Sequence, residues 1–179
     1  MVLTVARARA SAAWPGAEVK SLHSDFRCWQ GWAPSMQGPH QHDDIEVNLV
    51  TEGRMRYLFG GTPVEVAAGQ VAIFWATMPH RLINSPENSR AYVCWLHLPL
   101  PVVLQWGLPD TAVNGLLSGH PVVRGADDGH RLDAAMFGRW TTDLDSGSSE
   151  LRDVVHLEIQ AQLRRLFAAA GSGARHLAA

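Results

Sequence analysis

Cysteine is scarce in this sequence, which has only Cys28 and Cys94 among its 179 residues. Two cysteines without a short paired spacing are too few for a disulfide framework, a zinc ribbon or a redox motif, so we expect two reduced structural thiols. An uncharged apolar run of about 18 residues, long enough to cross a membrane, is also missing. At the N-terminus the arginines follow the apolar residues, the reverse of a secretory signal. These absences predict a cytoplasmic protein without a membrane partner.

An excess of one charge sign is absent as well, since the formal net charge is only -2. A domain that neutralises many phosphates needs clustered Lys and Arg, so we do not expect this chain to bind DNA strongly by itself. No nucleophile elbow, P-loop, dinucleotide fingerprint or H-E-x-x-H motif occurs, which disfavours catalysis by serine or cysteine. The nine histidines and seven tryptophans are more informative, because these residue types bind metals and stack on flat ligands.

The hydrophobic pattern divides the chain into an arm, a strand region and a helical region. Residues 1–17 have no sustained period and are predicted to form a flexible N-terminal arm. From residue 18 onward, short apolar or alternating runs separated by turn residues are typical of strands. The predicted strands are 19–23, 45–51, 54–59, 63–66, 71–75, 80–84 and 90–98, with turns at 52–53, 60–61, 68–69 and 86–88. Many short strands indicate a mainly β fold, either a sandwich or a barrel.

Helical periodicity replaces the strand pattern after residue 98. Helices are predicted over 110–117 and 128–144, and from Ser148 or Ser149 to about residue 170. The last helix carries an apolar stripe formed by Leu151, Val154, Val155, Ile159, Leu163, Leu166, Phe167 and Ala170. This stripe can pack on the barrel, on the preceding helix or on a second copy of the chain. Residues 171–179 have the composition of a linker, so we expect a further domain that is absent from this chain.

The stretch around residue 44 places several polar side chains on one face. In an extended chain, side chains two residues apart point the same way, so His40, His42, Asp44, Glu46 and Asn48 share a face. The opposite face is apolar. A half-buried strand on a flat sheet shows the same alternation, so the pattern alone does not establish a site.

Two stretches match the paired motifs of the cupin superfamily. The first motif, H-x-H-x3-E with a later glycine, is matched by His40, His42, Glu46 and Gly53. The second motif, G-x5-P-x-G-x2-H-x3-N, is matched by Gly69, His80 and Asn84, whereas Trp75 and Thr77 replace its proline and second glycine. The resemblance, which covers about residues 38–98, implies a cupin-type double-stranded β-helix barrel (jelly roll) followed by C-terminal helices.

In cupins the matching side chains converge in the barrel and bind one divalent metal. The resemblance therefore implies a metal site formed by His40, His42, Glu46 and His80. Three imidazoles and a carboxylate suit Zn, Ni, Fe or Mn, and affinity order does not choose among these metals. The alternative is a polar pocket without metal, formed by the same residues.

Several short sequence segments also resemble the N-terminal half of AraC-family transcription regulators, in particular the members that respond to melibiose. They are EVN at 46–48, FWATMPHRL at 74–82, LPL at 98–100, LQWGLP at 104–109, FGRW at 137–140 and EI at 158–159. This resemblance implies an effector-binding barrel over 18–108 whose small-molecule effector is a sugar. It further implies a helical segment over 109–170 that forms a homodimer, and DNA binding by a C-terminal helix-turn-helix domain absent from this chain.

Within that resemblance, the residues expected to contact the effector are His42, Glu46, Asn48, Trp75, His80 and Trp95. Trp75, Trp95 and Trp106 lie on or just after strands, where an indole can stack on a sugar, although core packing is the more common role. Trp95 is predicted to point inward. Arg54 and Arg56 are expected to be solvated hairpin residues. His97 has no readable partner spacing and is expected to be a surface or satisfied core histidine.

Three classes of function fit these features. The first is an effector sensor that changes the packing of the arm and the C-terminal helices. The second is a metal-dependent cupin enzyme, either a dioxygenase or a sugar isomerase. The third is a dimerisation module whose barrel is only a scaffold. The trailing helices and linker favour the non-enzymatic sensor.

Overall fold

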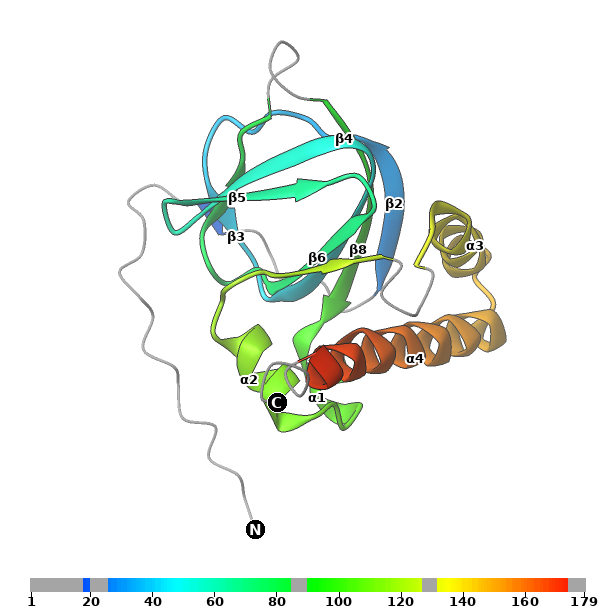
Figure 1. The fold of residues 1–179 in the computed structure, drawn as a ribbon. Helices are drawn as coiled ribbons and strands as arrows, with labels where there is room; N and C mark the ends of the chain where they lie inside the picture. Colours follow the sequence, from blue (N-terminus) through cyan, green and yellow to red (C-terminus); the bar gives the residue numbers. More distant parts are fainter. Residues whose placement is uncertain (1–17, 20–25, 85–89, 127–131, 174–179) are drawn as a thin grey trace.

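One long strand, β4 (Asp44–Phe59), organises the whole sheet of this computed structural model (Figure 1). The structure describes residues 18–19, 26–84, 90–126 and 132–173, so the predictions for 1–17, 20–23, 86–88, 128–131 and 174–179 lie outside the described residues. The first half of β4 pairs with two antiparallel strands, β6 (Gln70–Trp75) and β8 (Ala91–Pro99). Its second half pairs with two others, β5 (Thr62–Ala67) and β7 (His80–Leu82).

The turn predicted at 52–53 is wrong, because β4 continues through it. The pairing register with β8 shifts between Val50 and Glu52, which is the signature of a β-bulge. Gly53 has φ +70°, and a Cβ there would lie 1.9 Å from the carbonyl oxygen of Arg90. Only glycine fits this position without displacing the neighbouring backbone. The bulge bends β4, so one strand takes part in two sheets.

The two sheets face each other. One contains β4, β6 and β8 with two strands that the sequence did not predict, β2 (Arg27–Trp32) and β9 (Val122–Gly125). The other contains β4, β5 and β7 with the short strands β3 (His40–Gln41) and β1 (Glu18–Val19). With helices following the strands, this confirms the predicted mainly β, cupin-type jelly roll.

Four helices cover the outer face of the β2, β8, β4, β6 and β9 sheet and its lower end (Figure 1). They are α1 (Leu100–Gln105), α2 (Asp110–Leu117), α3 (Ala134–Asp145) and α4 (Ser149–Gly173). The prediction for α2 is confirmed, and α4 begins at one of the two serines proposed. Helix α3 begins only at 134, where Asp133 caps it by accepting a hydrogen bond from the Met136 amide at 2.8 Å. Helix α1, with 6 residues, was too short to predict.

The middle of the β2, β8, β4, β6 and β9 sheet, formed by β6, β8 and the first half of β4, is buried on both faces, which decides where the polar residues lie. On β4, Ile45, Val47 and Leu49 pack with α3 and α4 residues in one apolar cluster. Glu46 and Asn48 alternate with them and are also buried, at 3% and 0% exposure, on the side between the sheets. The polar face of this strand therefore lies inside the jelly roll instead of in water. Within the described part of the chain, no helix is both long and apolar enough to cross a bilayer.

Candidate metal and effector site

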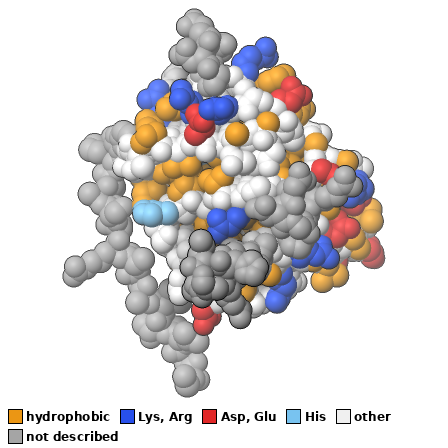
Figure 2. All heavy atoms as spheres, in the orientation of Figure 1, with side chains coloured by type: hydrophobic (Ala, Val, Ile, Leu, Met, Phe, Trp, Pro, Cys, Tyr) orange, Lys and Arg blue, Asp and Glu red, His pale blue; other side chains and the backbone are white. Residues whose placement is uncertain are grey.

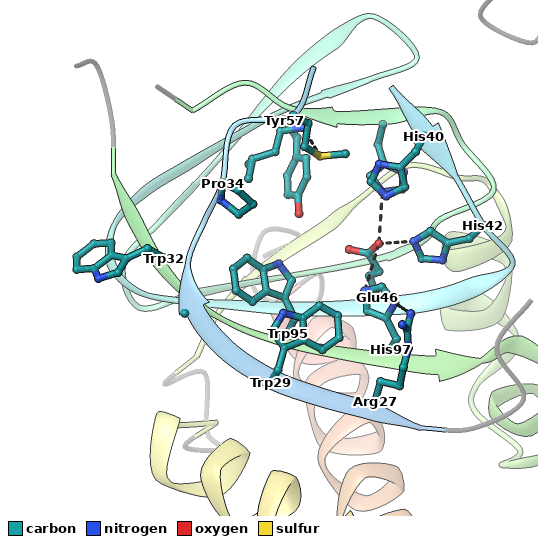
Figure 3. Close-up of a pocket in the computed structure, with 14 residues that line it drawn as sticks. Arg27, Trp29, Trp32, Pro34, His40, His42, Glu46, Tyr57, Trp95 and His97 are labelled. Carbon is teal, nitrogen blue, oxygen red and sulfur yellow. Dashed lines mark hydrogen bonds and ion pairs between the residues drawn. The ribbon is translucent and has the colours of Figure 1, made fainter. Parts of the chain in front are cut away.

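A cavity of about 410 Å³ opens between the two sheets (Figure 3). This volume lies in the range of small-molecule binding sites. Its walls combine aromatic, apolar and ionisable side chains, namely Arg27, Trp29, Gly31, Trp32, Pro34, Met36, His40, His42, Glu46, Tyr57, His80, Leu82, Trp95 and His97. The cavity therefore has room for a ligand beside a polar cluster.

The structure brings together the four residues predicted to bind metal. His40, His42, Glu46 and His80 each offer a donor atom, and these atoms lie within 4.8 Å of one another. The pairing of β3 with β7 sets His40 opposite His80, and the inward face of β4 supplies Glu46. Strand pairing thus assembles donors that are up to 40 positions apart in the sequence.

Glu46 lies at the centre of this cluster. Its Oε1 atom is 2.7 Å from His42 Nε2, 3.3 Å from His80 Nε2 and 3.5 Å from His97 Nε2. Its Oε2 atom accepts a hydrogen bond from Asn48 Nδ2 at 2.8 Å. Burial alone would raise the pKa of the Glu46 carboxyl, but the charge of His97 and the hydrogen bonds from His42 and His80 hold it well below its usual value. Glu46 is therefore a carboxylate at neutral pH.

His80 shows that the cluster fits a cation. Its Nδ1 lies 2.9 Å from the carbonyl oxygen of Met78, which can only accept, so Nδ1 carries the hydrogen. Nε2 is buried, and it can donate to Glu46 only while the ring carries a second hydrogen; in the neutral ring this atom holds the lone pair. That lone pair faces the Glu46 carboxylate at 3.3 Å. Two electron-rich atoms at this distance repel unless a proton or a metal ion is shared between them, so the donor set fits a metal.

His42 lies between two carboxylates. Its Nε2 faces Glu46, and its Nδ1 is 3.1 Å from Asp44 Oδ2. Burial alone would lower the pKa of His42, but the hydrogen bonds and charges of Asp44 and Glu46 raise it to about 9. The same contacts hold the pKa of Asp44 below its usual value against the opposing effect of its burial. Without a metal, the His42 imidazolium supplies the positive charge of the cluster.

These contacts indicate which residues would bind a metal. His40, His42, Glu46 and His80 would be its ligands, with Nε2 of His42 directed toward the cluster and Nδ1 directed to Asp44. Carboxylate and carbonyl partners on the outer nitrogens, here Asp44 for His42 and Met78 for His80, orient imidazole ligands in many metal sites. A bound divalent ion would supply a Lewis acid in the cavity wall.

An aromatic wall lies beside the cluster. Trp29 of β2 and Trp95 of β8 stack with ring centroids 5.7 Å apart and an angle of 18° between the ring planes (Figure 3). The prediction that Trp95 points inward agrees with this position. Trp29 was missed because its strand was not predicted. Trp32 lies farther out, at 48% exposure. Indole faces of this kind stack on the apolar face of a sugar or on another flat ligand.

Two residues predicted to contact the effector do not line the cavity. Trp75 is on the outer face of β6, packs against the helix-side cluster, and donates from Nε1 to Asp43 Oδ1 at 2.9 Å. Its neighbour Phe74 has the inward position, and the two-residue period of a strand sends Trp75 to the other face. Asn48 is fully buried and donates to Glu46 and to the Tyr57 hydroxyl. Asn48 therefore orients the side chains of Glu46 and Tyr57, which line the cavity, without lining it itself. Trp75 is not part of the proposed site.

The comparisons with known proteins decide the family. Residues 26–179 match the model of the AraC-like ligand binding domain. The chain belongs to this family. It is 27% identical over 149 residues to the melibiose operon regulatory protein of Escherichia coli K12, covering 83% of this chain and 46% of that protein. The O6:H1 strain of Escherichia coli has a relative with the same figures. The chain thus spans about half the length of the curated relatives that it matches.

Solved structures similar to this AraC-like domain include regulators and a cupin. Unsaturated fatty acid-bound ToxT from Vibrio cholerae is 13% identical, with a TM-score of 0.48 over 79% of this chain and 54% of that one. The AraC-like transcriptional activator CuxR is 14% identical, with a TM-score of 0.43 over 70% of this chain and 42% of that one. A cupin 2 conserved barrel domain protein from Salinispora arenicola is 18% identical, with a TM-score of 0.35 over 60% of this chain and 78% of that one.

The AraC-like domain also has site residues that the sequence did not reveal. His97, expected to be a surface or satisfied core histidine, pairs with Glu46 across β4 and β8, is only 8% exposed and lines the cavity. Its position two residues after the inward Trp95 was the available signal. Arg27 donates to His97 Nδ1 at 3.0 Å, and Asp44 Oδ2 is 3.4 Å from that same nitrogen. Arg27 was not detectable from sequence because β2 was not predicted.

Proposed function

We propose that this AraC-like domain is the effector-binding and dimerisation unit of a cytoplasmic transcription regulator, with a sugar as effector and a divalent metal in the barrel. One observation carries this proposal: a single cavity has a stacked tryptophan pair beside a cluster of metal-donor side chains. The tryptophans offer a surface for the apolar face of a sugar, and the polar cluster offers partners for its hydroxyl groups. A cavity of about 410 Å³ also argues against a barrel that is only a scaffold.

Strand β2 supports a route for the signal, because its two faces contact different parts of the molecule. Trp29 and Arg27 line the cavity, whereas Cys28 Sγ lies 3.5 Å from the Phe137 carbonyl oxygen of α3. Phe26, which precedes β2, stacks on His156 of α4 with ring centroids 3.9 Å apart. An effector that displaces Trp29 would therefore bias the positions of α3 and α4, which is the differential contact that a sensor needs.

The surface of α4 supports a homodimer. Val155, Ile159 and Leu163 of the predicted stripe are buried in the core cluster, whereas its members Leu151 and Val154 are not. Leu151, Val154 and Leu157 are exposed on the same helix, at 39%, 44% and 66%. Figure 2 shows hydrophobic side chains among charged ones at the end of the molecule where α3 and α4 meet. A second copy of the helix would cover this apolar row in an isologous contact.

DNA binding is assigned to a C-terminal helix-turn-helix domain outside these 179 residues. The formal net charge of -2 supports this assignment, because a chain without a basic surplus gains little from releasing counterions on DNA.

A metal-dependent dioxygenase or sugar isomerase is the second candidate, because the four-donor cluster adjoins the cavity. The curated relatives that this chain matches carry the name of a regulatory protein, which favours the sensor. Product formation by metal-loaded protein with sugars or catechols would establish the enzyme instead.

The test combines metal analysis with ligand binding on untagged protein. We expect about one divalent metal per chain in the wild type and in the His120→Ala control, and much less in His40→Ala. His120 is exposed and does not line the cavity, and His40 is only half-buried, so both variants should fold. Calorimetry with melibiose, galactose and glucose should show binding that Trp29→Ala weakens. Absence of metal would remove the metal from the proposal, and absence of sugar binding would remove the sugar.

A further inference from the structure

Arg27 is the sole Lys or Arg among the residues that line the cavity in the described part of the chain. It lies at the start of β2, beside the polar cluster (Figure 3). Its side chain is 42% exposed, in contrast to Asp44 at 2% and Glu46 at 4%. A cation with this exposure can reach both the cluster and a ligand in the cavity.

The guanidinium of Arg27 keeps most of its hydrogen-bonding capacity. A guanidinium has five N–H donors. Within the described residues, one hydrogen bond is formed, from Nη2 to His97 Nδ1 at 3.0 Å. Its acidic neighbour, Asp44 Oδ2, is 3.9 Å away, beyond hydrogen-bonding distance. Several donors therefore remain for a group that enters the cavity.

Once a divalent metal is bound, the two nearby carboxylates do not neutralise Arg27, because the ion itself balances their charge. Asp44 Oδ2 lies 3.1 Å from His42 and 3.4 Å from His97. Glu46 Oε1 lies within 3.5 Å of three imidazoles. With the proposed divalent metal and neutral imidazoles, two carboxylates face one guanidinium and one doubly charged ion, which leaves one positive charge. A neutral sugar would leave that charge without a partner in the cavity, whereas a carboxylate would pair with it.

The other arginines with ion pairs differ from Arg27. Arg54 and Arg56 both bind Glu65 on the exposed hairpin of β4 and β5, outside the cavity. Each therefore has a carboxylate partner, whereas Arg27 faces a ligand site and lacks a close one. The charge pattern distinguishes a binding residue from solvated surface residues.

We infer that the effector is an acid, a sugar acid whose carboxylate binds the guanidinium of Arg27 while its ring lies against Trp29 and Trp95. This inference rests on the proposed function, since it assumes that the effector occupies this cavity. Arginine binds carboxylates through two parallel charge-assisted hydrogen bonds, which are stronger than those of a neutral hydroxyl. Arg27 would thus select an acid over the neutral sugar of the same shape.

The experiment compares matched acid and neutral sugars by calorimetry on metal-loaded, untagged protein. The pairs are galacturonate with galactose and glucuronate with glucose, and 2-hydroxybenzoate is a third kind of acid. The variants are Arg27→Gln and, as matched control, Arg54→Gln. We expect at least one uronate to bind about tenfold or more tightly than its neutral partner to the wild type and to Arg54→Gln. In Arg27→Gln this preference should fall below about threefold, with melting temperature unchanged.

The outcomes separate the two proposals. Equal affinity for acid and neutral sugar, or a preference that survives in Arg27→Gln, overturns the inference and leaves the sugar-binding function in place. Arg27-dependent binding of 2-hydroxybenzoate without binding of any sugar supports an acidic effector and removes the sugar. If none of the five compounds binds, the inference fails, and the proposed sugar-binding function fails with it when melibiose does not bind either.

Discussion

Metal binding should release close to one proton from His42 at pH 7. In the metal-free domain the ring lies between two carboxylates, with Nε2 2.7 Å from Glu46 Oε1 and Nδ1 3.1 Å from Asp44 Oδ2. These contacts outweigh the burial that alone would lower the pKa, and raise it to about 9. A ring with this pKa is about 99% protonated at pH 7. Because a metal needs a neutral imidazole nitrogen, the proton must leave when the metal binds.

The size of this effect follows from the distance between pH 7 and the pKa of His42. Each pH unit below the pKa corresponds to 1.36 kcal/mol, so at pH 7 removal of the proton from His42 makes the free energy of metal binding less favourable by about 2.7 kcal/mol. The apparent affinity should therefore be about 100-fold weaker at pH 7 than above pH 9. Between these values it should rise about tenfold per pH unit.

The assay is calorimetric titration of Zn²⁺ into metal-free, untagged domain at pH 7 in three buffers with different ionisation enthalpies. The slope of observed against buffer enthalpy gives the number of protons released. Asp44→Asn removes one of the two carboxylates that raise the pKa of His42, so proton release should fall clearly below that of the wild type. Asp110→Asn, an exposed position on α2, is the control.

A slope of zero for the wild type, with metal bound, would refute a protonated His42. Release that stays the same in Asp44→Asn would contradict its assignment to this residue. Affinity alone is a poorer readout, because Asp44 also orients the His42 ring and its loss weakens metal binding by that separate route.

Three further predictions concern stability and assembly. The pKa of His42 is about 9 in the folded domain, against an ordinary value of 6.5. The protonated ring therefore stabilises the folded state fully below pH 6.5, and this contribution is lost as the pH rises to 9. The melting temperature of the metal-free domain should fall over this range in scanning calorimetry. Gly53→Ala should destabilise the domain far more than Gly61→Ala in urea titrations. Both glycines have a positive φ, which costs a residue with a Cβ about 1–2 kcal/mol. Only at Gly53 would the added Cβ also collide with backbone, 1.9 Å from the Arg90 carbonyl oxygen. Leu157→Glu should convert the dimer to a monomer in sedimentation experiments without changing the stability of the domain. Leu104→Glu, on the exposed surface of α1, is the control and should leave the dimer intact. Equal behaviour of the two variants would argue against the α4 interface.

Much of the polar cluster was predictable because it depends on local geometry. His42 and Glu46 lie in one short stretch whose alternation fixes a common face, and that regularity needs no knowledge of distant residues. His80 was assigned to the site by the motif resemblance. Helices α2 and α4 were predictable for the same reason, since helical period and capping residues are local signals.

The remaining site residues depend on how distant strands pair. Arg27 and Trp29 became part of the cavity only because β2 pairs with β8, and the sequence of β2, RCWQGW, shows no simple alternation of apolar and polar residues. The inward direction of Phe74, and hence the exclusion of Trp75, is likewise set by the packing of β6.

The sequence by itself determined the class of fold, the family resemblance and the four candidate metal ligands, because spacing and residue type are read along the chain. The tertiary structure alone decided that Glu46 faces three imidazoles and that an exposed arginine lies beside the cavity. The physical reason is that electrostatic neighbours and cavity walls are formed by contacts between strands far apart in sequence, whose register is set by the packing of the whole jelly roll.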